Sequence, residues 1–222
     1  MRIYAVADIH GKTEKIDIIK SIISHEKPDL LVIAGDITNY VCGVKTVAQL
    51  KELPVPVFCV RGNSDFKYIE KILQGQKNIT LLNHKPLVFK AAGFLGLNGT
   101  IPLPLLSKIS FWERRTLAHL KNGVTPETIL VAHPPPRGVC DKVGNKLSAG
   151  SFVLKRFIEN HSPLMVLCGH IHEQAGYQFL NKTLVVNCAM NKKINGAIID
   201  YDNHMTLKVK MIGNDNYINK GR

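Results

Sequence analysis

The sequence predicts an α/β fold in which two β-sheets, each mixed or partly antiparallel, pack together with helices on the outside. Short apolar runs bounded by turn residues recur along the whole 222-residue chain, and segments of helical periodicity lie between several of them. The last block of apolar segments, from residue 176 onward, has hardly any helix signal. Because we find no internal repeat, low-complexity segment or linker, we expect one domain over residues 1–222.

The first sixty residues predict the order strand, helix, strand, helix, strand. Residues 2–7 are a short, nearly continuous apolar run of the kind that forms a buried strand. Isoleucines then recur at helical spacing, with Thr13 as the expected N-cap and Pro28 ending the pattern. The other three elements are a buried strand, a short helix closed by prolines and a third strand, at residues 30–34, 45–53 and 55–60.

The middle of the chain is less regular, and its end is rich in strands. Residues 79–98 predict two or three short strands, and a turn-rich loop follows at residues 98–104. The segment Ser110–Glu113 fits a capping box that opens a helix, with Gly123 as its stop. After this helix we expect strands at 128–132, 164–168, 176–180, 183–187, 196–201 and 205–211, and one helix near 151–160. The strand-rich second half predicts the second sheet.

The composition is that of an ordinary globular protein with a surplus of positive charge. Hydrophobic residues make up 45% and charged residues 21% of the chain, which excludes the collagen-like, coiled-coil and disordered classes. Lys and Arg outnumber Asp and Glu by 29 to 17, which gives a net charge of +12. The basic residues are scattered, and no block of five or more like charges marks a nucleic-acid-binding tail. We therefore favour general surface charge, and nucleic acid is the less favoured partner.

Cysteine use and the length of the apolar runs bear on the compartment. The five cysteines are an odd set with no CxxC spacing, which argues against a secreted disulfide framework and a Cys-based zinc site. Residues 1–7 are too short an apolar stretch for a signal peptide, and no run approaches the roughly 18 apolar residues of a membrane span. We expect a cytoplasmic protein with no membrane partner.

Polar side chains follow five of the apolar runs at the point where each run ends. In chain order these residues are Asp8, His10, Asp36, Asn63, His133, His170 and His172. Because the carboxyl ends of strands in an open α/β sheet converge on one crevice, we expect these side chains to meet there. In an extended chain, residues i and i+2 point to the same face, so Asp8 and His10 both face the crevice, and His170 and His172 do likewise.

The donor types in this set favour a transition-metal site. Imidazole and carboxylate together suit Zn²⁺, Mn²⁺ and iron ions, whereas Ca²⁺ takes oxygen ligands only. Asp36 has two oxygens and can bridge two cations. Glycines at 35, 62 and 169 each precede a candidate ligand, as expected where the backbone turns sharply or approaches an ion closely.

Each candidate ligand also has a purely structural explanation. Asp36 and Asn63 belong to residue types that favour helix caps and turns, and His133 can simply end a strand. The combination decides between the two interpretations, because five strand ends with suitable donors in one order are hard to explain by chance. The sequence therefore predicts a dinuclear metal site.

The order of these residues resembles the calcineurin-like metallophosphoesterase superfamily. The match covers most of the chain, from residue 5 to about residue 190, and the compact length is most similar to small prokaryotic or archaeal members. The resemblance implies a four-layer αββα sandwich, with helices around two packed β-sheets. It also implies a first metal held by Asp8, His10, Asp36 and His172, and a second held by Asp36, Asn63, His133 and His170, with Asp36 bridging.

The resemblance implies hydrolysis of a phosphate ester by water that two divalent metal ions activate. Manganese is the expected metal, with iron, zinc, nickel and cobalt as alternatives. Asn63 and Asp65 fall in the family's catalytic motif, where Asp65 is expected to orient neighbouring groups. The histidine that usually stands between them is Ser64 here, and its hydroxyl is too weak an acid to replace an imidazole. Because relatives without this histidine resemble phosphodiesterases, we predict a phosphodiesterase.

Substrate contacts are predicted at three positions. Ser64 can bond a phosphate oxygen, whereas Asn98 after a strand and Arg137 in a proline-stiffened loop either reach the crevice or are plain loop residues. The expected substrate is a phosphate ester, with nucleotides among the candidates, and the oligomeric state is left open. Two alternative functions are a metal-dependent nuclease, favoured by the +12 charge, and a protein-interaction scaffold without turnover, which the complete set of seven candidate ligands disfavours.

Overall fold

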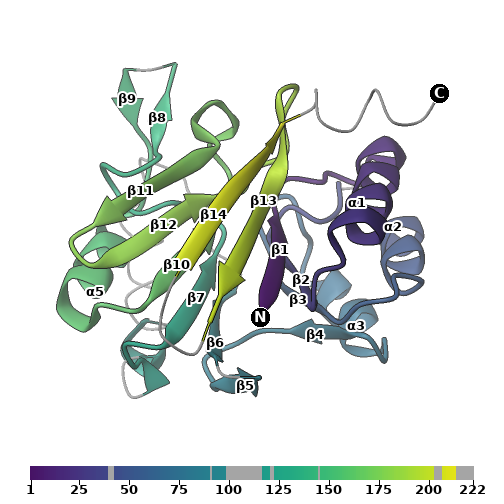
Figure 1. The fold of residues 1–222 in the computed structure, drawn as a ribbon, viewed down its shortest axis with the longest axis horizontal. Coiled ribbons are helices and arrows are strands. Elements are labelled where there is room, and N and C mark those ends of the chain that lie inside the picture. The colour runs from purple at the N-terminus through teal and green to yellow at the C-terminus, as the bar shows by residue number, and fades with distance from the viewer. Residues whose placement is uncertain are drawn as a thin grey trace.

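Two six-stranded sheets form the centre of the protein, and helices lie on the outside (Figure 1). A computed structural model describes residues 1–39, 43–90, 92–98, 117–120, 123–144, 146–202 and 207–213. The first sheet has the strand order β14-β13-β1-β2-β3-β4, and the second has the order β11-β12-β10-β7-β6-β5. The prediction of an α/β fold with two sheets is confirmed.

The first sheet combines the earliest strands with the last two. Strands β1 to β4 run parallel, β13 pairs antiparallel with β1, and β14 pairs antiparallel with β13. The strands are β1 (Arg2–Val6), β2 (Leu30–Ala34), β3 (Val57–Val60), β4 (Ile79–Leu81), β13 (Ile194–Tyr201) and β14 (Leu207–Gly213). The three central strands β1, β2 and β3 therefore end at the same edge.

The second sheet is parallel in its middle and antiparallel at both edges. Strands β6, β7, β10 and β12 run parallel, while β5 and β11 pair antiparallel at the two ends. The strands are β5 (Leu87–Phe89), β6 (Ala92–Leu97), β7 (Thr128–Ala132), β10 (Met165–Cys168), β11 (Gly176–Leu180) and β12 (Thr183–Asn187). Both sheets are mixed, as predicted.

The helices cover the outer faces of both sheets. They are α1 (Thr13–Glu26), α2 (Gly43–Leu50) and α3 (Tyr68–Gln74) on the first sheet and α5 (Phe152–His161) on the second (Figure 1). Strand β1 shows how the layers pack. Its Tyr4 and Val6 join the core beneath the helices, whereas Ile3 and Ala5 join the core between the sheets. Burial on both faces explains the continuous apolar run, and the result is a four-layer αββα sandwich.

Helix α1 differs from the prediction at its first residue. Lys12 occupies the N-cap position and makes no side-chain cap hydrogen bond, so Thr13 is the first helical residue and its assignment as N-cap is wrong. The helix ends at Glu26, because Lys27 adopts a left-handed conformation with φ of 48° just before Pro28.

Three short elements escape the sequence patterns. Helix α3 covers seven residues, although its Ile69 and Leu73 are buried at four-residue spacing. The hairpin of β8 (Lys142–Val143) and β9 (Leu147–Ser148), and the 3₁₀ turn η2 (His172–Gln174), are too short to carry a period.

Part of the predicted middle region lies outside the described residues. This applies to the helix opening at Ser110–Glu113 and to the loop from residue 99 onward, whereas residues 117–120 are helical and precede Gly123. Four cysteines are buried with free thiols, and Cys42 lies outside the described residues. Within the described ranges, no helix combines the length and the apolar character needed to cross a bilayer.

Candidate metal centre

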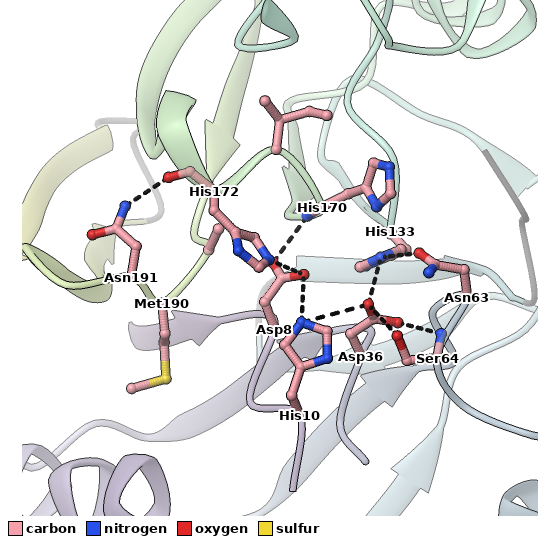
Figure 2. Close-up of polar contacts among 12 residues, drawn as sticks. Asp8, His10, Asp36, Asn63, Ser64, His133, His170, His172, Met190 and Asn191 are labelled. Carbon is pink, nitrogen blue, oxygen red and sulfur yellow. Dashed lines mark hydrogen bonds and ion pairs between the residues drawn. The ribbon is translucent and has the colours of Figure 1, made fainter. Parts of the chain in front are cut away.

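The seven candidate ligands converge at the seam between the two sheets (Figure 2). Four come from loops after β1, β2 and β3, which are neighbours in the first sheet, and three histidines come from loops after β7 and β10, which are neighbours in the second. In chain order, the loops after β1, β2 and β3 carry Asp8 with His10, Asp36 and Asn63, and those after β7 and β10 carry His133, His170 and His172. The predicted convergence of strand ends is therefore what the structure shows.

The backbone of this site is left-handed, not extended. Asp8, His10, Asp36 and His170 have φ values of 62°, 54°, 50° and 70°, a region that side chains other than glycine rarely adopt. The i, i+2 argument for an extended chain is therefore wrong, although the side chains it paired do lie together. Left-handed residues turn the chain sharply straight after the strand, and this turn brings the donors over the strand ends.

Glycines make room for two of the carboxylates. A Cβ atom on Gly62 would overlap Oδ1 and the amide nitrogen of Asp36 and lie 2.9 Å from its Cγ. A Cβ atom on Gly169 would lie 2.6 Å from Oδ2 of Asp8. Real Cβ atoms do not make such contacts, so both positions require glycine for close approach of the loops.

Asp36 lies in the middle of the site. Its Oδ2 is 3.4 Å from Nε2 of His133 and 3.8 Å from Nε2 of His10. Its Oδ1 accepts a hydrogen bond of 2.7 Å from the amide of Ser64, and its Oδ2 accepts one of 2.9 Å from the Ser64 hydroxyl. Asp36 therefore faces histidines from both sheets.

His133 is fully buried and oriented through both ring nitrogens. Nδ1 lies 2.9 Å from the carbonyl oxygen of Ala34, and Nε2 lies 2.9 Å from Oδ1 of Asn63. Because a carbonyl can only accept, Nδ1 carries a proton and donates it to Ala34, which directs Nε2 into the site. A metal-binding histidine is oriented in this way. The ring also lies 5.1 Å from the ring of His170, centroid to centroid.

Asp8 is fully buried and has one carboxylate oxygen without a hydrogen bond. Oδ2 accepts a hydrogen bond of 2.9 Å from the amide of His170. Oδ1 lies 3.1 Å from Nε2 of His172 and 3.8 Å from Nε2 of His10, yet accepts no aligned hydrogen bond from the described part of the chain. A buried carboxylate oxygen needs a donor or a cation, so this atom fits a metal ligand.

The pKa values of the site follow from burial and from paired charges. Burial would raise the pKa of Asp8 and of Asp36, but the imidazoles of His172 and His133 hold both pKa values below their usual range. Burial would lower the pKa of His133, but Asp36 and Asp8 raise it to about 9. Burial, reinforced by the charge of His133, lowers the pKa of His170 to about 4. Both carboxylates are therefore ionised at neutral pH, the form that binds cations.

Among the residues that the structure describes, two groups of three side chains offer ligand atoms that all lie within 4.8 Å of one another. They are Asp8, His10 and His172, and Asp8, Asp36 and His133. Carboxylate oxygen and imidazole nitrogen suit zinc, manganese and iron ions. Together with the oxygen of Asp8 that lacks a hydrogen bond, this donor set fits a divalent metal centre.

Asp65 and Ser64 act inside the loops of the site. Both carboxylate oxygens of Asp65 are engaged, with the amides of Ile37, Thr38 and Gly62 at 2.7 to 3.1 Å and the Thr38 hydroxyl at 2.8 Å. Asp65 therefore joins the loop of Asp36 to the loop of Asn63. The Ser64 hydroxyl is buried and donates its hydrogen to Asp36, which leaves it no hydrogen for a phosphate oxygen in this arrangement.

The other two candidate substrate residues lie around the loops that carry the ligands. Asn98 follows β6, and its Oδ1 accepts a hydrogen bond of 2.6 Å from the amide of Arg61, just before the Asn63 loop. The guanidinium of Arg137 lies 4.6 Å from the ring centroid of Phe152, in a cation–π contact. Neither of these two contacts involves a candidate ligand.

The sequence patterns do not predict the residues that hydrogen-bond to the backbone of the loops carrying the candidate ligands. Asn187 donates to the carbonyl of Ile171, Asn191 donates to the carbonyl of His172, and Lys15 donates to the carbonyl of Asp8. Each of these bonds ends on a main-chain carbonyl outside the element or loop that carries the donor. A lone Lys or Asn in a sequence carries no signal for such a partner.

The chain is similar to known proteins along most of its length. The family model for calcineurin-like phosphoesterases matches residues 1–174. An uncharacterised protein of Methanocaldococcus jannaschii is 29% identical over 199 residues, which are 84% of this chain and 87% of that protein. A Caenorhabditis elegans protein is 23% identical over 219 residues, which are 88% of this chain and 71% of that protein.

Solved structures share the fold at low sequence identity. A dimetal phosphatase from Danio rerio has a TM-score of 0.70 at 12% identity, with 96% of both chains covered. A Thermus thermophilus protein has a TM-score of 0.68 at 16% identity, with 95% of this chain and 98% of the other covered. An archaeal phosphodiesterase has a TM-score of 0.54 at 13% identity, with 96% and 100% covered. At these identities the likeness shows the four-layer fold.

Proposed function

This chain belongs to the calcineurin-like phosphoesterase family, and on that premise we propose that it is a dinuclear-metal phosphodiesterase. The position of Asp36 carries the proposal. Its carboxylate faces His10 on one side and His133 on the other, at 3.8 and 3.4 Å, and so has a histidine from each sheet within reach. One carboxylate between two sets of donors is the arrangement that two neighbouring cations require.

We assign the ligands in two sets that share Asp36. The first ligand set is Asp8, His10, Asp36 and His172, and the second ligand set is Asp36, Asn63, His133 and His170. When bound, a metal pair of this kind makes water nucleophilic at neutral pH and stabilises negative charge on the phosphoryl oxygens. The chain itself keeps both aspartates ionised, directs Nε2 of His133 into the site through Ala34, and aligns the loops of Asp36 and Asn63 through Asp65. We propose manganese as the metal, because mixed oxygen and nitrogen donors suit it.

The identity of residue 64 supports the preference for diesters. An imidazole at this position would supply a proton to the leaving group, whereas the Ser64 hydroxyl is a weak acid and already donates to Asp36. The absence of one general acid lowers the rate by roughly 10²–10⁴-fold when the leaving group needs a proton. We therefore propose substrates with good leaving groups, such as aryl or nucleotide diesters.

Substrate contacts and location complete the proposal. Asn98 lies beside the Asn63 loop, and Arg137 follows His133 by four residues, so both are candidates for contact with the leaving group. Ser64 can bond a phosphate oxygen only if its hydroxyl turns away from Asp36, because a phosphodiester oxygen can only accept a hydrogen bond. The proposed location is the cytoplasm.

The proposal is tested with protein freed of metal and reloaded with Mn²⁺. We expect two ions per chain and faster hydrolysis of bis-p-nitrophenyl phosphate than of p-nitrophenyl phosphate or an alkyl monoester. Ser64→His should raise monoester hydrolysis relative to diester hydrolysis, whereas Ser64→Ala should not. A metal-loaded wild type that prefers alkyl monoesters would refute the diester proposal. A nucleic-acid substrate in the same panel tests the nuclease alternative, which requires affinity that falls steeply with salt.

A further inference from the structure

The segment after β12 lies where the two sheets meet. Ala7, directly after β1 of the first sheet, forms an isolated parallel bridge with Ala189, which follows β12 of the second. The amide of Ala7 donates to the carbonyl of Cys188 over 3.0 Å, and the amide of Met190 donates to the carbonyl of Ala7 over 3.0 Å. These bonds join the sheets one residue before Asp8. The segment lies beyond residues 1–174, the part that the family model matches.

Asn191 connects this segment to His172. Its Nδ2 donates a hydrogen bond of 2.6 Å to the carbonyl of His172, as Figure 2 shows. Its Oδ1 accepts hydrogen bonds of 2.8 Å from the amides of Lys193 and Ile194, which fix the turn before β13. The two ends of the Asn191 side-chain amide therefore have different roles. The oxygen stabilises the turn before β13, and the nitrogen bonds the loop that carries His172.

Lys15 connects the same segment to Asp8. Its side chain reaches from helix α1, half-buried, and Nζ donates to the main-chain carbonyls of Asp8 and Met190, the latter over 2.8 Å. One ammonium thus fixes a residue after β1 and a residue after β12. Asp8 needs such support because its backbone is left-handed, with φ of 62°.

The residues that these two side chains hold form the closest pair between the sheets in the first ligand set. Oδ1 of Asp8 lies 3.1 Å from Nε2 of His172, and the two residues come from opposite sheets. A metal site tolerates displacements of its ligands of only about 0.5 Å. Bonds that fix both backbones to one segment therefore set the distance across the seam.

We propose that Lys15 and Asn191 are positioning residues that hold Asp8 and His172 at the spacing which the first metal requires. This inference rests on the proposed metal centre, and it assigns a role to two residues outside the ligand sets. The second ligand set keeps its own supports, namely the bonds of Ala34 to His133 and of Ser64 to Asp36. Loss of either positioning residue should therefore weaken the first metal site much more than the second.

Asn191→Asp is the sharper test, because it keeps the oxygen that accepts from Lys193 and Ile194 and removes the donor to His172. Asn83→Asp is the matched control: Asn83 is exposed, and its Oδ1 accepts from the amide of Lys85 in a similar turn. Removal of partners that orient metal ligands lowers metal affinity by about 10–100-fold. We expect a loss of this size for one of two Mn²⁺ ions in calorimetric titrations of Asn191→Asp, and none for Asn83→Asp.

Lys15→Met tests the contact between Lys15 and the Asp8 carbonyl. Its control is Lys20→Met, on the exposed side of the same helix. Both test substitutions make the protein more negative, which by charge alone would strengthen cation binding. A weaker site is therefore opposite in sign to the electrostatic effect. The Mn²⁺ electron paramagnetic resonance spectrum adds a second readout, because with two ions supplied per chain the variants should show isolated ions where the wild type shows interacting pairs.

The outcomes distinguish failure of the proposed dinuclear metal centre from failure of the positioning role of Lys15 and Asn191. If the wild type binds no second Mn²⁺, the proposed dinuclear function fails. If the wild type binds two ions and Asn191→Asp and Lys15→Met bind both with unchanged affinity, the positioning role is refuted. Equal weakening of both ions with a lowered melting temperature of the metal-free variant would also refute it, because that pattern indicates a general structural role. Should Lys15→Met fail to fold, Asn191→Asp still decides.

Discussion

The substitution Gly62→Ala tests the construction of the site without removing any ligand. Gly62 follows Arg61 at the end of β3 and immediately precedes Asn63. Its amide donates a hydrogen bond of 2.9 Å to Asp65, and its Cα faces the backbone of Asp36. An added methyl group meets Asp36 at both its carboxylate and its amide nitrogen. No flexible side-chain end can move aside here.

The size of the effect follows from the contact distances. The new Cβ atom would lie 2.9 Å from Cγ of Asp36, whereas ordinary van der Waals contacts begin near 3.4 Å. The two loops must therefore separate by at least about 0.5 Å, which is the whole tolerance of a preorganised site. A displacement approaching 1 Å lowers turnover by about 10²-fold, and the overpacking lowers the free energy of unfolding by about 1–3 kcal/mol.

The assay compares Gly62→Ala with Gly93→Ala, whose added methyl group meets nothing within 4 Å. We expect Mn²⁺-dependent hydrolysis of bis-p-nitrophenyl phosphate to fall by about 10²-fold in the first variant and to stay near wild type in the second. Urea unfolding reports the accompanying loss of stability. A Gly62→Ala protein with wild-type turnover and wild-type stability would show that the loops are not held this closely, and the reasoning would be refuted.

Three further predictions concern stability. Asp65→Ala leaves the buried amides of Ile37, Thr38 and Gly62 without their acceptor, so the free energy of unfolding in urea should fall by at least about 3 kcal/mol. Asp17→Ala, at an exposed position, should change it little. Similar losses in both variants would contradict the role of Asp65. The pKa of Asp29 is lowered by the Lys90 ammonium and the Arg2 amide, so its carboxylate stabilises the fold above about pH 4 and loses this contribution as pH falls through the folded-state pKa. Asp29→Asn should therefore lower the free energy of unfolding by roughly 0.5–1 kcal/mol at pH 7, a small value because the ion pair of Asp29 and Lys90 is partly exposed. A difference from wild type that stays the same at pH 2–3 would contradict this prediction. Mn²⁺ at about 100 times its Kd should stabilise the metal-free protein by about 2.7 kcal/mol per site. The melting temperature should therefore rise, and a chelator should reverse the rise. No rise at any Mn²⁺ concentration would exclude binding to the folded state.

The sequence predicts the strands well because most of them are buried on both faces. Strands such as β7 and β12 begin and end where the predicted runs do, because a strand between two layers is apolar along most of its length and polar residues follow it. Helix α3 and the hairpin of β8 and β9 carry too few residues for a period to stand out. Their positions depend on contacts with distant segments, which no local pattern records.

The candidate site is likewise only partly predictable from the sequence. The candidate ligands can be found in the sequence because polar side chains follow the strand ends closely, as with Asp36 two residues after Ala34 and His133 directly after Ala132. The way they are held is not visible. The donation of the Ser64 hydroxyl to Asp36 and the bonds of Lys15 and Asn191 to main-chain carbonyls join segments far apart in the chain. Only the packed fold determines these partners.

The left-handed backbones of Asp8, His10, Asp36 and His170 also have a cost in stability. Such a conformation is disfavoured by up to roughly 1–2 kcal/mol for a residue other than glycine, and by less for aspartate, so the four together cost on the order of a few kcal/mol. A domain of ordinary stability has only about 5–15 kcal/mol in total. Selection for a metal site and selection for a durable fold therefore act against each other at these four positions. A descendant of this protein that gave up its chemistry and placed glycine there would relieve this backbone cost, and its ligand loops would be the first part of the sequence free to diverge.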